Sequence, residues 1–328
     1  MRTTLTLGLS IGLAACAATP APQEKVGAPV ISAPEFRITQ EPVHGDFAFE
    51  GAFRQGGIVI GTAPQGATGV MLDGRAVPVD PDRRFLIAFD RDARPTARIT
   101  ATFADGGKVE RVLNVVSGTW RIERVDAPLR PVRDSEAFMA MRKPELEAIA
   151  AARAEGTDAH GWRQRFYWPI TGRVSGLFGA QRIYRGEPGA YHGGVDVAAA
   201  TGAPVRAPAD GVVVLAADKP FSLEGNLLLI DHGAGLNSAF LHLSRIDVKK
   251  GDHVTRGQVI GAVGATGRAT GPHMHWGLMW NGARLDPVLL TGPMPSAPPV
   301  SAALQRMDCS DTQAQQNKCD PAPVPSER

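Results

Sequence analysis

Residues 270–278 read TGPHMHWGL and place two histidines, His273 and His275, one residue apart after a Gly-Pro pair. Residues i and i+2 of a β-strand project from the same side, so the two imidazoles would face one space if this segment is a strand. Two explanations compete, namely coincidence in a strand and a metal site. Because imidazole nitrogens are common zinc ligands, the choice depends on whether the chain supplies further ligands.

The composition is that of an ordinary folded protein. The chain has 328 residues, of which 43% are hydrophobic and 21% are charged, and this length favours two domains. A formal net charge of +2 and the lack of an Arg/Lys-rich run argue against a nucleic-acid partner. The 37 glycines and 26 prolines indicate many turns. We therefore predict a mainly β fold rather than a helical bundle.

The first 16 residues, MRTTLTLGLSIGLAAC, have the pattern of an export signal. A basic residue precedes an apolar core that is too short to span a bilayer. The closing Leu-Ala-Ala-Cys resembles the lipobox of bacterial lipoproteins, which implies cleavage before Cys16 and its lipidation. Cleavage at a small-residue site, with Cys16 incidental, is the alternative. We expect a lipid-anchored protein on the periplasmic side of the cell envelope. Because Ala17 is not an aspartate, the outer membrane is favoured over the inner membrane.

Changes in composition divide the rest of the chain. Residues 17–34 are rich in Pro and Ala and predict a disordered tether. Residues 35–125 hold short alternating stretches with Asp-Gly turns, which predict a β-sandwich. This region has no cluster of chemically active residues, so we expect a spacer or a module that binds envelope proteins. A short helical linker at 126–164, a β-rich domain at 165–290 and a disordered Pro-rich tail at 291–328 follow.

The linker contains one segment with helical character, residues 134–155. Asp134 and Ser135 are candidate caps, and Gly156 is a candidate stop signal. Pro144 lies in the middle, and a proline inside a helix breaks or kinks it, so we expect two short helices. The apolar residues expected to pack on a neighbour are Phe138, Met141, Leu146 and Ile149.

A second pair of candidate ligands, His192 and Asp196, lies in YHGGVDV. The two residues are four apart, but the glycines between them argue against a helix and favour a turn entering a strand. A catalytic zinc keeps three protein ligands, typically imidazole or carboxylate, and one open position. The His-Asp pair and the His-x-His pair together supply more than enough ligands. Six of the eight histidines fall within the β-rich region: His192, His232, His242, His253, His273 and His275.

The order of these motifs resembles that of the lysostaphin/LytM-type zinc metalloendopeptidases of bacterial cell walls. HxxxD comes first, then His-Leu in FLHLS, then HxH after Thr-Gly-Pro, with APADGVV, DHG and VKKGDHVTRGQVIGAVG in matching places. The resemblance covers residues 165–290. It implies a C-terminal β-rich LytM-type peptidase domain that the helical linker joins to the N-terminal β-sandwich.

The resemblance also implies a role for each residue. His192, Asp196 and His275 match the ligands of one Zn²⁺ ion per chain. His273 matches the general base that polarises the attacking water, and His242 matches the histidine that helps hold this water and stabilises the oxyanion. Zinc would activate water and polarise the scissile carbonyl. The implied substrate is the peptide cross-link of peptidoglycan, and the anchor favours a D-alanyl–diaminopimelate link.

The sequence departs from the family at two positions. Phe240 precedes His-Leu where a Tyr is frequent, and Gly277 follows the aromatic residue after HxH where a Glu is frequent. These departures concern substrate detail rather than the metal. His232 and His253 fit turns of the same fold and are interpreted as structural or surface residues.

The alternative function is that of a catalytically silent LytM-type protein, an activator or scaffold of cell-wall amidases that has lost ligands. All five family positions are filled in this chain. We therefore favour an active peptidase that serves cell-wall remodelling or division.

The two remaining cysteines, Cys309 and Cys319, lie in the polar tail stretch DCSDTQAQQNKCD. An exported protein meets an oxidising compartment, so a disulfide across this short loop is one prediction. A metal-binding pair is disfavoured because no histidine lies nearby.

Overall fold

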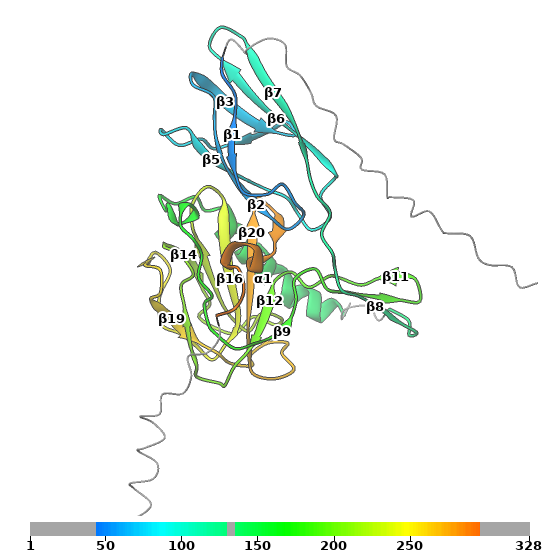
Figure 1. The fold of residues 1–328 in the computed structure, drawn as a ribbon. Coiled ribbons are helices and arrows are strands. Elements are labelled where there is room, and N and C mark those ends of the chain that lie inside the picture. Colours follow the sequence, from blue (N-terminus) through cyan, green and yellow to red (C-terminus); the bar gives the residue numbers. More distant parts are fainter. Residues whose placement is uncertain (1–43, 130–134, 296–328) are drawn as a thin grey trace, which may run out of the picture. The chain divides into compact units, whose positions relative to one another are not determined.

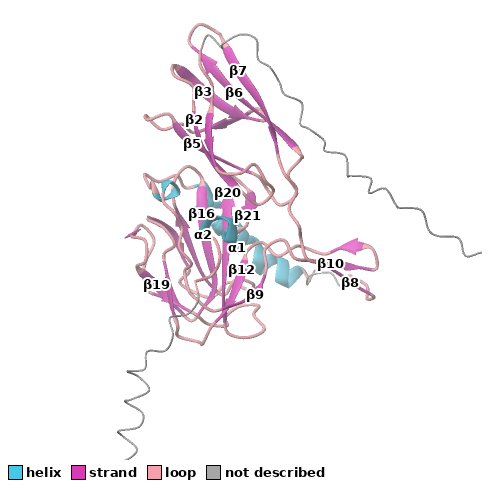
Figure 2. Ribbon diagram, viewed as in Figure 1, coloured by secondary structure: helices cyan, strands magenta, loops and turns pink. Residues whose placement is uncertain are grey.

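Most of the regular secondary structure in the described residues is β-strand (Figure 2). The computed structural model describes residues 44–129 and 135–295, and its α-helices in these ranges are α1 (Glu136–Ala154) and α2 (Pro287–Thr291). The predicted mainly β fold is therefore confirmed. Neither described helix is long and apolar enough to cross a membrane.

Several predictions fall outside the described residues. The signal peptide, the lipidation site Cys16 and the tether all precede residue 44. The cysteine pair, Cys309 and Cys319, and nearly all of the tail lie beyond residue 295. They stay predictions.

Two antiparallel sheets form the N-terminal β-domain (Figure 1). Their strands are β1 (Ala48–Glu50), β2 (Ile58–Thr62), β3 (Ala67–Leu72), β4 (Arg75–Val77), β5 (Arg84–Ala88), β6 (Thr96–Phe103) and β7 (Lys108–Asn114). One sheet has the order β1-β2-β5 and the other the order β4-β3-β6-β7. Along β6 the side chains alternate between solvent and core, and Ile99 and Ala101 are fully buried. The alternating sequence pattern thus builds the core shared by both sheets.

The last strand of the predicted sandwich range, β8 (Ile122–Val125), pairs elsewhere. It runs parallel to β10 (Gln181–Tyr184), which also pairs with β11 (Glu187–Pro188). The N-terminal sheets therefore end with β7. The alternating pattern of this four-residue strand is compatible with pairing either to the N-terminal sheets or to β10, so the sequence does not specify which pairing forms.

An eight-stranded sheet forms the centre of the C-terminal domain. Its order is β18-β14-β15-β16-β20-β12-β9, and β21 pairs with β20. A smaller sheet has the order β13-β19-β17, and every described pairing within both sheets is antiparallel. The bounds are β9 (Arg173–Gly176), β12 (Val195–Ala198), β13 (Pro204–Arg206), β14 (Gly211–Ala216), β15 (Asn226–Asp231), β16 (Leu236–Leu243), β17 (Arg245–Ile246), β18 (His253–Val254), β19 (Val259–Ala262), β20 (His273–Trp280) and β21 (Ala283–Leu285), with a short 3₁₀ helix at Gly161–Arg163.

The central strand β20 shows how the two faces of this sheet differ. Met274 and Trp276 are fully buried in the core. His273, His275 and Gly277 alternate with them and project from the opposite face. The prediction that the two imidazoles share one side of a strand is therefore confirmed.

Helix α1 packs on the same sheet face as His275. Its residues Ile149 and Ala152 form an apolar cluster with Leu229 and Ala239. Ala239 lies directly opposite Gly277 in the antiparallel pairing of β16 and β20, so both residues project from one face. The helix thus covers the sheet face next to His275, over Ala239 and Gly277.

The prediction of two short helices is wrong, because α1 is continuous through Pro144. The proline removes one backbone hydrogen bond to Ala140, but both residues are exposed, so water can satisfy the freed carbonyl. The Ser135 hydroxyl accepts a hydrogen bond from the backbone N–H of Phe138 and caps the first turn. Phe138 before the proline and Ile149 after it are both buried, so packing on both sides of Pro144 keeps the helix continuous.

Only part of the apolar side of α1 is buried. Phe138 and Ile149 are buried as predicted, whereas Met141 and Leu146 are 50% and 46% exposed. Leu146 lines a cavity between the helix and the sheet, and this open space leaves its side chain accessible.

His232 is a structural residue of the core. Its Nδ1 donates to the backbone oxygen of Asp210 at 2.7 Å, and its Nε2 accepts from the Ser238 hydroxyl at 2.7 Å. The Ser238 oxygen in turn accepts from the indole N–H of Trp276. Burial lowers the pKa of His232 to about 4, so the ring is neutral in the folded protein.

This burial predicts a pH dependence of stability. The folded pKa lies below the unfolded value of about 6.5, so the unfolded state binds more protons between these values and stability falls as pH falls. We expect His232 to reduce the free energy of unfolding by about 3 kcal/mol between pH 6.5 and pH 4. Urea unfolding of wild type and His232→Gln at several pH values measures this effect. If the free energy of unfolding fell equally with falling pH in both proteins, this prediction would be wrong.

Candidate metal centre

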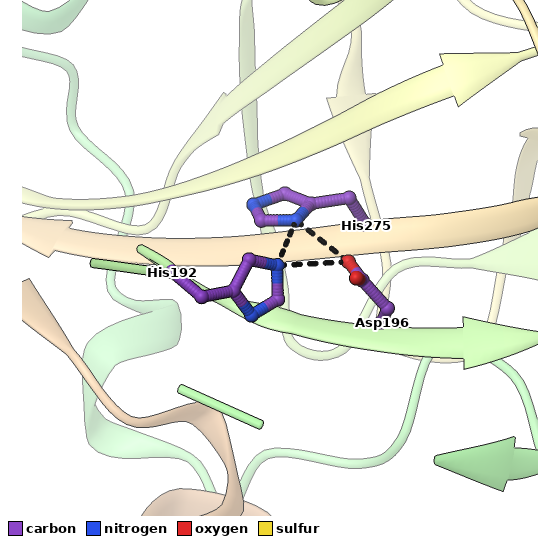
Figure 3. Close-up of side chains that lie close together, drawn as sticks. All are labelled: His192, Asp196 and His275. Carbon is purple, nitrogen blue, oxygen red and sulfur yellow. Dashed lines mark hydrogen bonds and ion pairs between the residues drawn. The ribbon is translucent and has the colours of Figure 1, made fainter. Parts of the chain in front are cut away.

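Three side chains converge at the junction of β12 and β20 (Figure 3). His192 Nε2 lies 3.0 Å from Asp196 Oδ1 and 3.0 Å from His275 Nδ1. His275 Nδ1 lies 2.8 Å from the same carboxylate oxygen. One atom from each residue therefore points into a single small space.

Strand pairing brings two of these residues together. Asp196 on β12 is directly opposite His275 on β20 in the antiparallel register. Side chains opposite each other in such a pair lie on one face and within reach. His192 lies in an irregular segment that bends at Gly194 and enters β12 at Val195, so the predicted absence of a helix here is confirmed.

Glycines provide the space for this convergence. A Cβ at Gly176 would lie 2.3 Å from Asp196 Oδ2. A Cβ at Gly194 would lie 2.4 Å from the backbone oxygen of Trp276 and 2.7 Å from His275 Nε2. Any side chain at these two positions would displace a converging group.

Hydrogen bonds fix how the His192 ring presents its nitrogens. His192 Nδ1 lies 3.0 Å from the backbone oxygen of Leu177. Because a carbonyl oxygen only accepts, Nδ1 carries the proton and leaves Nε2 with a lone pair directed at the other two residues. Metal-bound histidines commonly donate their other ring N–H to a carbonyl or carboxylate in this way.

The charges at the site favour a cation. Burial opposes ionisation of Asp196, but hydrogen bonds from His192 and His275 outweigh it and hold the pKa of this carboxyl well below its usual range. Burial also opposes protonation of His192, yet the bond to Asp196 raises its pKa. For His275 burial prevails and lowers the pKa, which favours a neutral ring. The centre therefore brings one carboxylate oxygen and two imidazole nitrogens within 3.0 Å of one another. Their lone pairs repel unless a proton or a metal ion lies between them.

The three ligand atoms fit a zinc ion. Two imidazole nitrogens and one carboxylate oxygen are ligands that zinc takes, and a fourth position remains for a non-protein ligand. Ligands of a tetrahedral zinc lie about 3.3 Å from one another. The observed separations of 2.8 to 3.0 Å therefore require the side chains to move apart by only a few tenths of an ångström.

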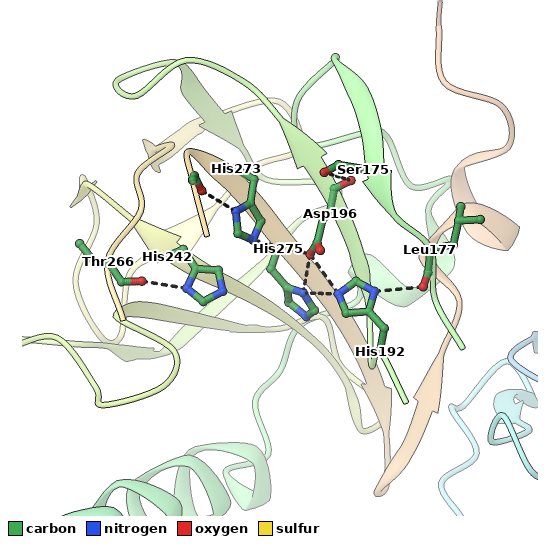
Figure 4. Close-up of polar contacts among 9 residues, drawn as sticks. Ser175, Leu177, His192, Asp196, His242, Thr266, His273 and His275 are labelled. Carbon is green, nitrogen blue, oxygen red and sulfur yellow. Dashed lines mark hydrogen bonds and ion pairs between the residues drawn. The ribbon is translucent and has the colours of Figure 1, made fainter. Parts of the chain in front are cut away.

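His273 and His242 lie beside these three residues (Figure 4). His273 Nδ1 donates to the backbone oxygen of Gly271 at 2.8 Å, and its Nε2 is 3.9 Å from Asp196 Oδ1. His242 Nδ1 donates to the backbone oxygen of Thr266 at 2.8 Å. The two ring centres are 4.9 Å apart. Each neutral ring therefore keeps Nε2 as a hydrogen-bond acceptor.

The backbone of His242 is held in an unusual conformation. Its φ of 63° lies in the left-handed region that side chains other than glycine rarely adopt. Its backbone N–H donates to the carbonyl of Glu224, and the pairing of β15 with β16 shifts register nearby. Residues held in such conformations concentrate at functional sites. The structure thus brings all five predicted site residues together.

The remaining histidines of the sequence lie away from this centre. His44 stacks on Phe103 with ring centres 4.1 Å apart. His253 is exposed on β18, and His160 lies 3.8 Å from Asp80.

Sequence reasoning missed a cavity of about 480 Å³ beside the five residues. Residues of α1 line it on one side, and His192, His242 and His275 are also part of its lining. Arg142 of α1 donates two hydrogen bonds of 2.6 Å to Glu224, and the Glu145 carboxylate accepts from Ser222 at 2.6 Å. These contacts hold α1 against the loop before β15. No pattern in the sequence marks them, because they join residues about 80 positions apart.

The segment that holds this centre is similar to a known protein family. Residues 190–287 match peptidase family M23. Peptidoglycan DD-endopeptidase ShyA of Vibrio cholerae is 40% identical over 143 residues, which are 43% of this chain and 33% of ShyA. DD-carboxypeptidase/endopeptidase Mpg of Neisseria meningitidis is 38% identical over 152 residues, 45% of this chain and 32% of Mpg. The chain thus spans about a third of the length of these relatives.

The similarity to a solved structure extends further. A crystal structure from Pseudomonas aeruginosa assigned to peptidase M23 is 29% identical, with a TM-score of 0.56. The match covers 73% of this chain and 95% of that chain. The shared fold therefore reaches beyond the residues that match the family.

The glycine at position 194 yields a test of the metal centre. Gly194→Ala would press against Trp276 and His275, so we expect zinc affinity to fall about tenfold to a hundredfold, as for changes beside metal ligands in general. Competition with a chromogenic chelator measures the affinity. Gly156→Ala is the matched control, because a Cβ there meets nothing within 4 Å. Equal zinc affinity in the two variants would contradict the assignment.

Proposed function

We propose that this chain is a zinc-dependent endopeptidase, a proposal that starts from the match of residues 190–287 to peptidase family M23. Its substrate would be the peptide cross-links of bacterial peptidoglycan, cleaved during cell-wall remodelling or division. The single observation that best supports this proposal is the convergence of His192, Asp196 and His275 beside two further histidines.

Each histidine has a role that follows from its hydrogen bonds. Zinc, when bound, supplies Lewis-acid polarisation of the scissile carbonyl. His273 Nε2 has no proton in the neutral ring, because Nδ1 donates to Gly271, so it can accept a proton from an attacking water. Once protonated, it can pass this proton to the leaving amine.

His242 is placed to assist the same step. Its Nδ1 proton is engaged by Thr266, so its Nε2 can accept a hydrogen bond from the water. Burial lowers its pKa and keeps the ring neutral before the reaction. The other hydrogen of the water stays on oxygen and is donated to His242 Nε2, so His242 holds the water while His273 takes its proton.

The names of the relatives support the choice of bond. ShyA is named a peptidoglycan DD-endopeptidase, and Mpg is named a DD-carboxypeptidase/endopeptidase. We propose the same class of bond for this chain, the D-alanyl–diaminopimelate cross-link. The N-terminal sheets would serve as a spacer or as a docking module for envelope proteins.

Digestion of purified peptidoglycan tests this function. Zinc-loaded wild type should release monomeric muropeptides from cross-linked dimers, as identified by mass spectrometry. His273→Ala should retain one zinc per chain and lose activity about a hundred- to ten-thousand-fold, because the proton acceptor is gone. His275→Ala should lose both zinc and activity.

Two outcomes would contradict the assignment of roles or function. A His273→Ala protein that cleaves at nearly the wild-type rate would overturn the role of His273. A wild type that cleaves nothing but stimulates a cell-wall amidase would favour the activator function instead.

The location of the protein is a separate proposal. Cys16 closes a Leu-Ala-Ala-Cys sequence behind an apolar segment, which supports lipidation and anchoring on the periplasmic side, at the outer membrane. Cys16→Ser should move the protein from the membrane fraction to the soluble fraction. Unchanged fractionation, with no lipid adduct in the mass of the wild type, would show that the anchor is wrong.

A further inference from the structure

The cavity beside the metal centre contains an arginine without a counter-charge. Arg153, in the last turn of α1, reaches across to β20, where its Nη1 lies 3.2 Å from the sulfur of Met279. Its Nε is fully buried and makes no hydrogen bond. Among the described residues, no carboxylate lies within ion-pair distance of this guanidinium. A guanidinium has five N–H donors, so most of its hydrogen-bonding capacity is unused.

The position of Arg153 is not explained by the helix alone. A cation in the last turn of a helix is stabilised by the carbonyl groups there. The Arg153 side chain instead crosses to Met279 on the opposite wall. Burial and the positive charge of Arg284 lower the pKa of Arg153, and the negative charge of Glu224 offsets part of this effect. An anion in the cavity would therefore stabilise the guanidinium further.

A second guanidinium belongs to the same region. Arg284 on β21 is directly opposite Met279 in the antiparallel pairing, so its side chain starts beside the sulfur that Arg153 contacts. It lies over the ring of Tyr191, 5.5 Å from the ring centre. A Cβ at Gly193 would lie 3.2 Å from its Cδ, so the missing side chain next to His192 lets Arg284 pass close to the metal centre.

The other charged residues of the cavity do not balance these two. The carboxylates of Glu224 and Glu145 both pair with Arg142, and among the described residues neither Arg153 nor Arg284 forms an ion pair. The Asp90 carboxylate accepts a hydrogen bond from the backbone N–H of Arg284 at 2.8 Å, but it does not pair with the guanidinium. Arg268 also lines the cavity, but it is exposed and can be hydrated. The space next to the metal ligands is therefore suited to an anion.

We propose that Arg153 and Arg284 form a subsite that binds a free carboxylate of the peptide substrate next to the scissile bond. This inference rests on the proposed function and narrows its substrate class. In a D-alanyl–diaminopimelate link, the amine that forms the link belongs to an amino-acid centre that keeps its own carboxylate. That carboxylate would supply the acceptors that both guanidinium groups lack, in a bidentate or bridging arrangement.

Two synthetic cross-linked peptides test the subsite. They differ only in whether the carboxyl group next to the scissile nitrogen is free or amidated. Zinc-loaded wild type should prefer the free carboxylate by about tenfold to a hundredfold in kcat/KM, as expected for a charged hydrogen bond. Arg153→Gln and Arg284→Gln should each bring this ratio toward one.

Arg245→Gln is the matched control, because Arg245 pairs with Asp247 and lies outside the cavity. It should keep the wild-type preference. Thermal unfolding establishes that each variant is folded, and Arg153→Lys, which retains charge without the planar fork, should keep part of the preference.

Binding separates failure of the subsite from failure of the proposed function. Calorimetry with the His273→Ala protein measures the affinity for both peptides without turnover. If the wild type cleaves nothing, yet the free carboxylate binds more tightly and Arg153→Gln abolishes the difference, the subsite stands and the function is wrong. If the wild type cleaves and binds both peptides equally, or if Arg153→Gln keeps the preference, the subsite is wrong and the function stands.

Discussion

The antiparallel pairing of β12 with β20 is the constraint on which the centre depends. It places Asp196 opposite His275, so backbone hydrogen bonds define the distance between two ligands before any ion is present. The core side of the same strands is anchored by Val195, Val197 and Trp276, all fully buried. A slip of one residue would turn His275 into the core and Met274 or Trp276 toward the cavity. Burial of the core therefore enforces the register that the ligands need.

Backbone carbonyls complete this arrangement. The Nδ1 atoms of His192, His242 and His273 each face a carbonyl oxygen, from Leu177, Thr266 and Gly271 respectively. Each bond orients a ring and fixes which nitrogen carries the proton. The chemistry assigned to these histidines therefore follows from loop conformation as much as from residue type. The left-handed backbone of His242 is part of the cost of this placement.

The sequence specified the centre better than its surroundings. Strand alternation predicted that His273 and His275 share one face, and the glycines between His192 and Asp196 predicted a turn entering a strand, because both signals are local. The convergence of the two pairs, about 80 positions apart, was implied by the resemblance to the LytM-type family. The course of α1 was not predictable in this way. Pro144 suggested a break, but its exposed position lets water replace the lost hydrogen bond. The contacts of Arg142 and Arg153 join residues about 80 and 126 positions apart, and no local pattern encodes such a pairing.

Zinc K-edge X-ray absorption of the loaded protein tests the central claim, that His192, Asp196 and His275 hold one ion, most directly. We expect only nitrogen and oxygen ligands at about 2.0–2.2 Å, with two imidazoles, in the wild type, and no stoichiometric bound zinc in His275→Ala. Sulfur at about 2.3 Å, or an unchanged imidazole count in His275→Ala, would contradict the account.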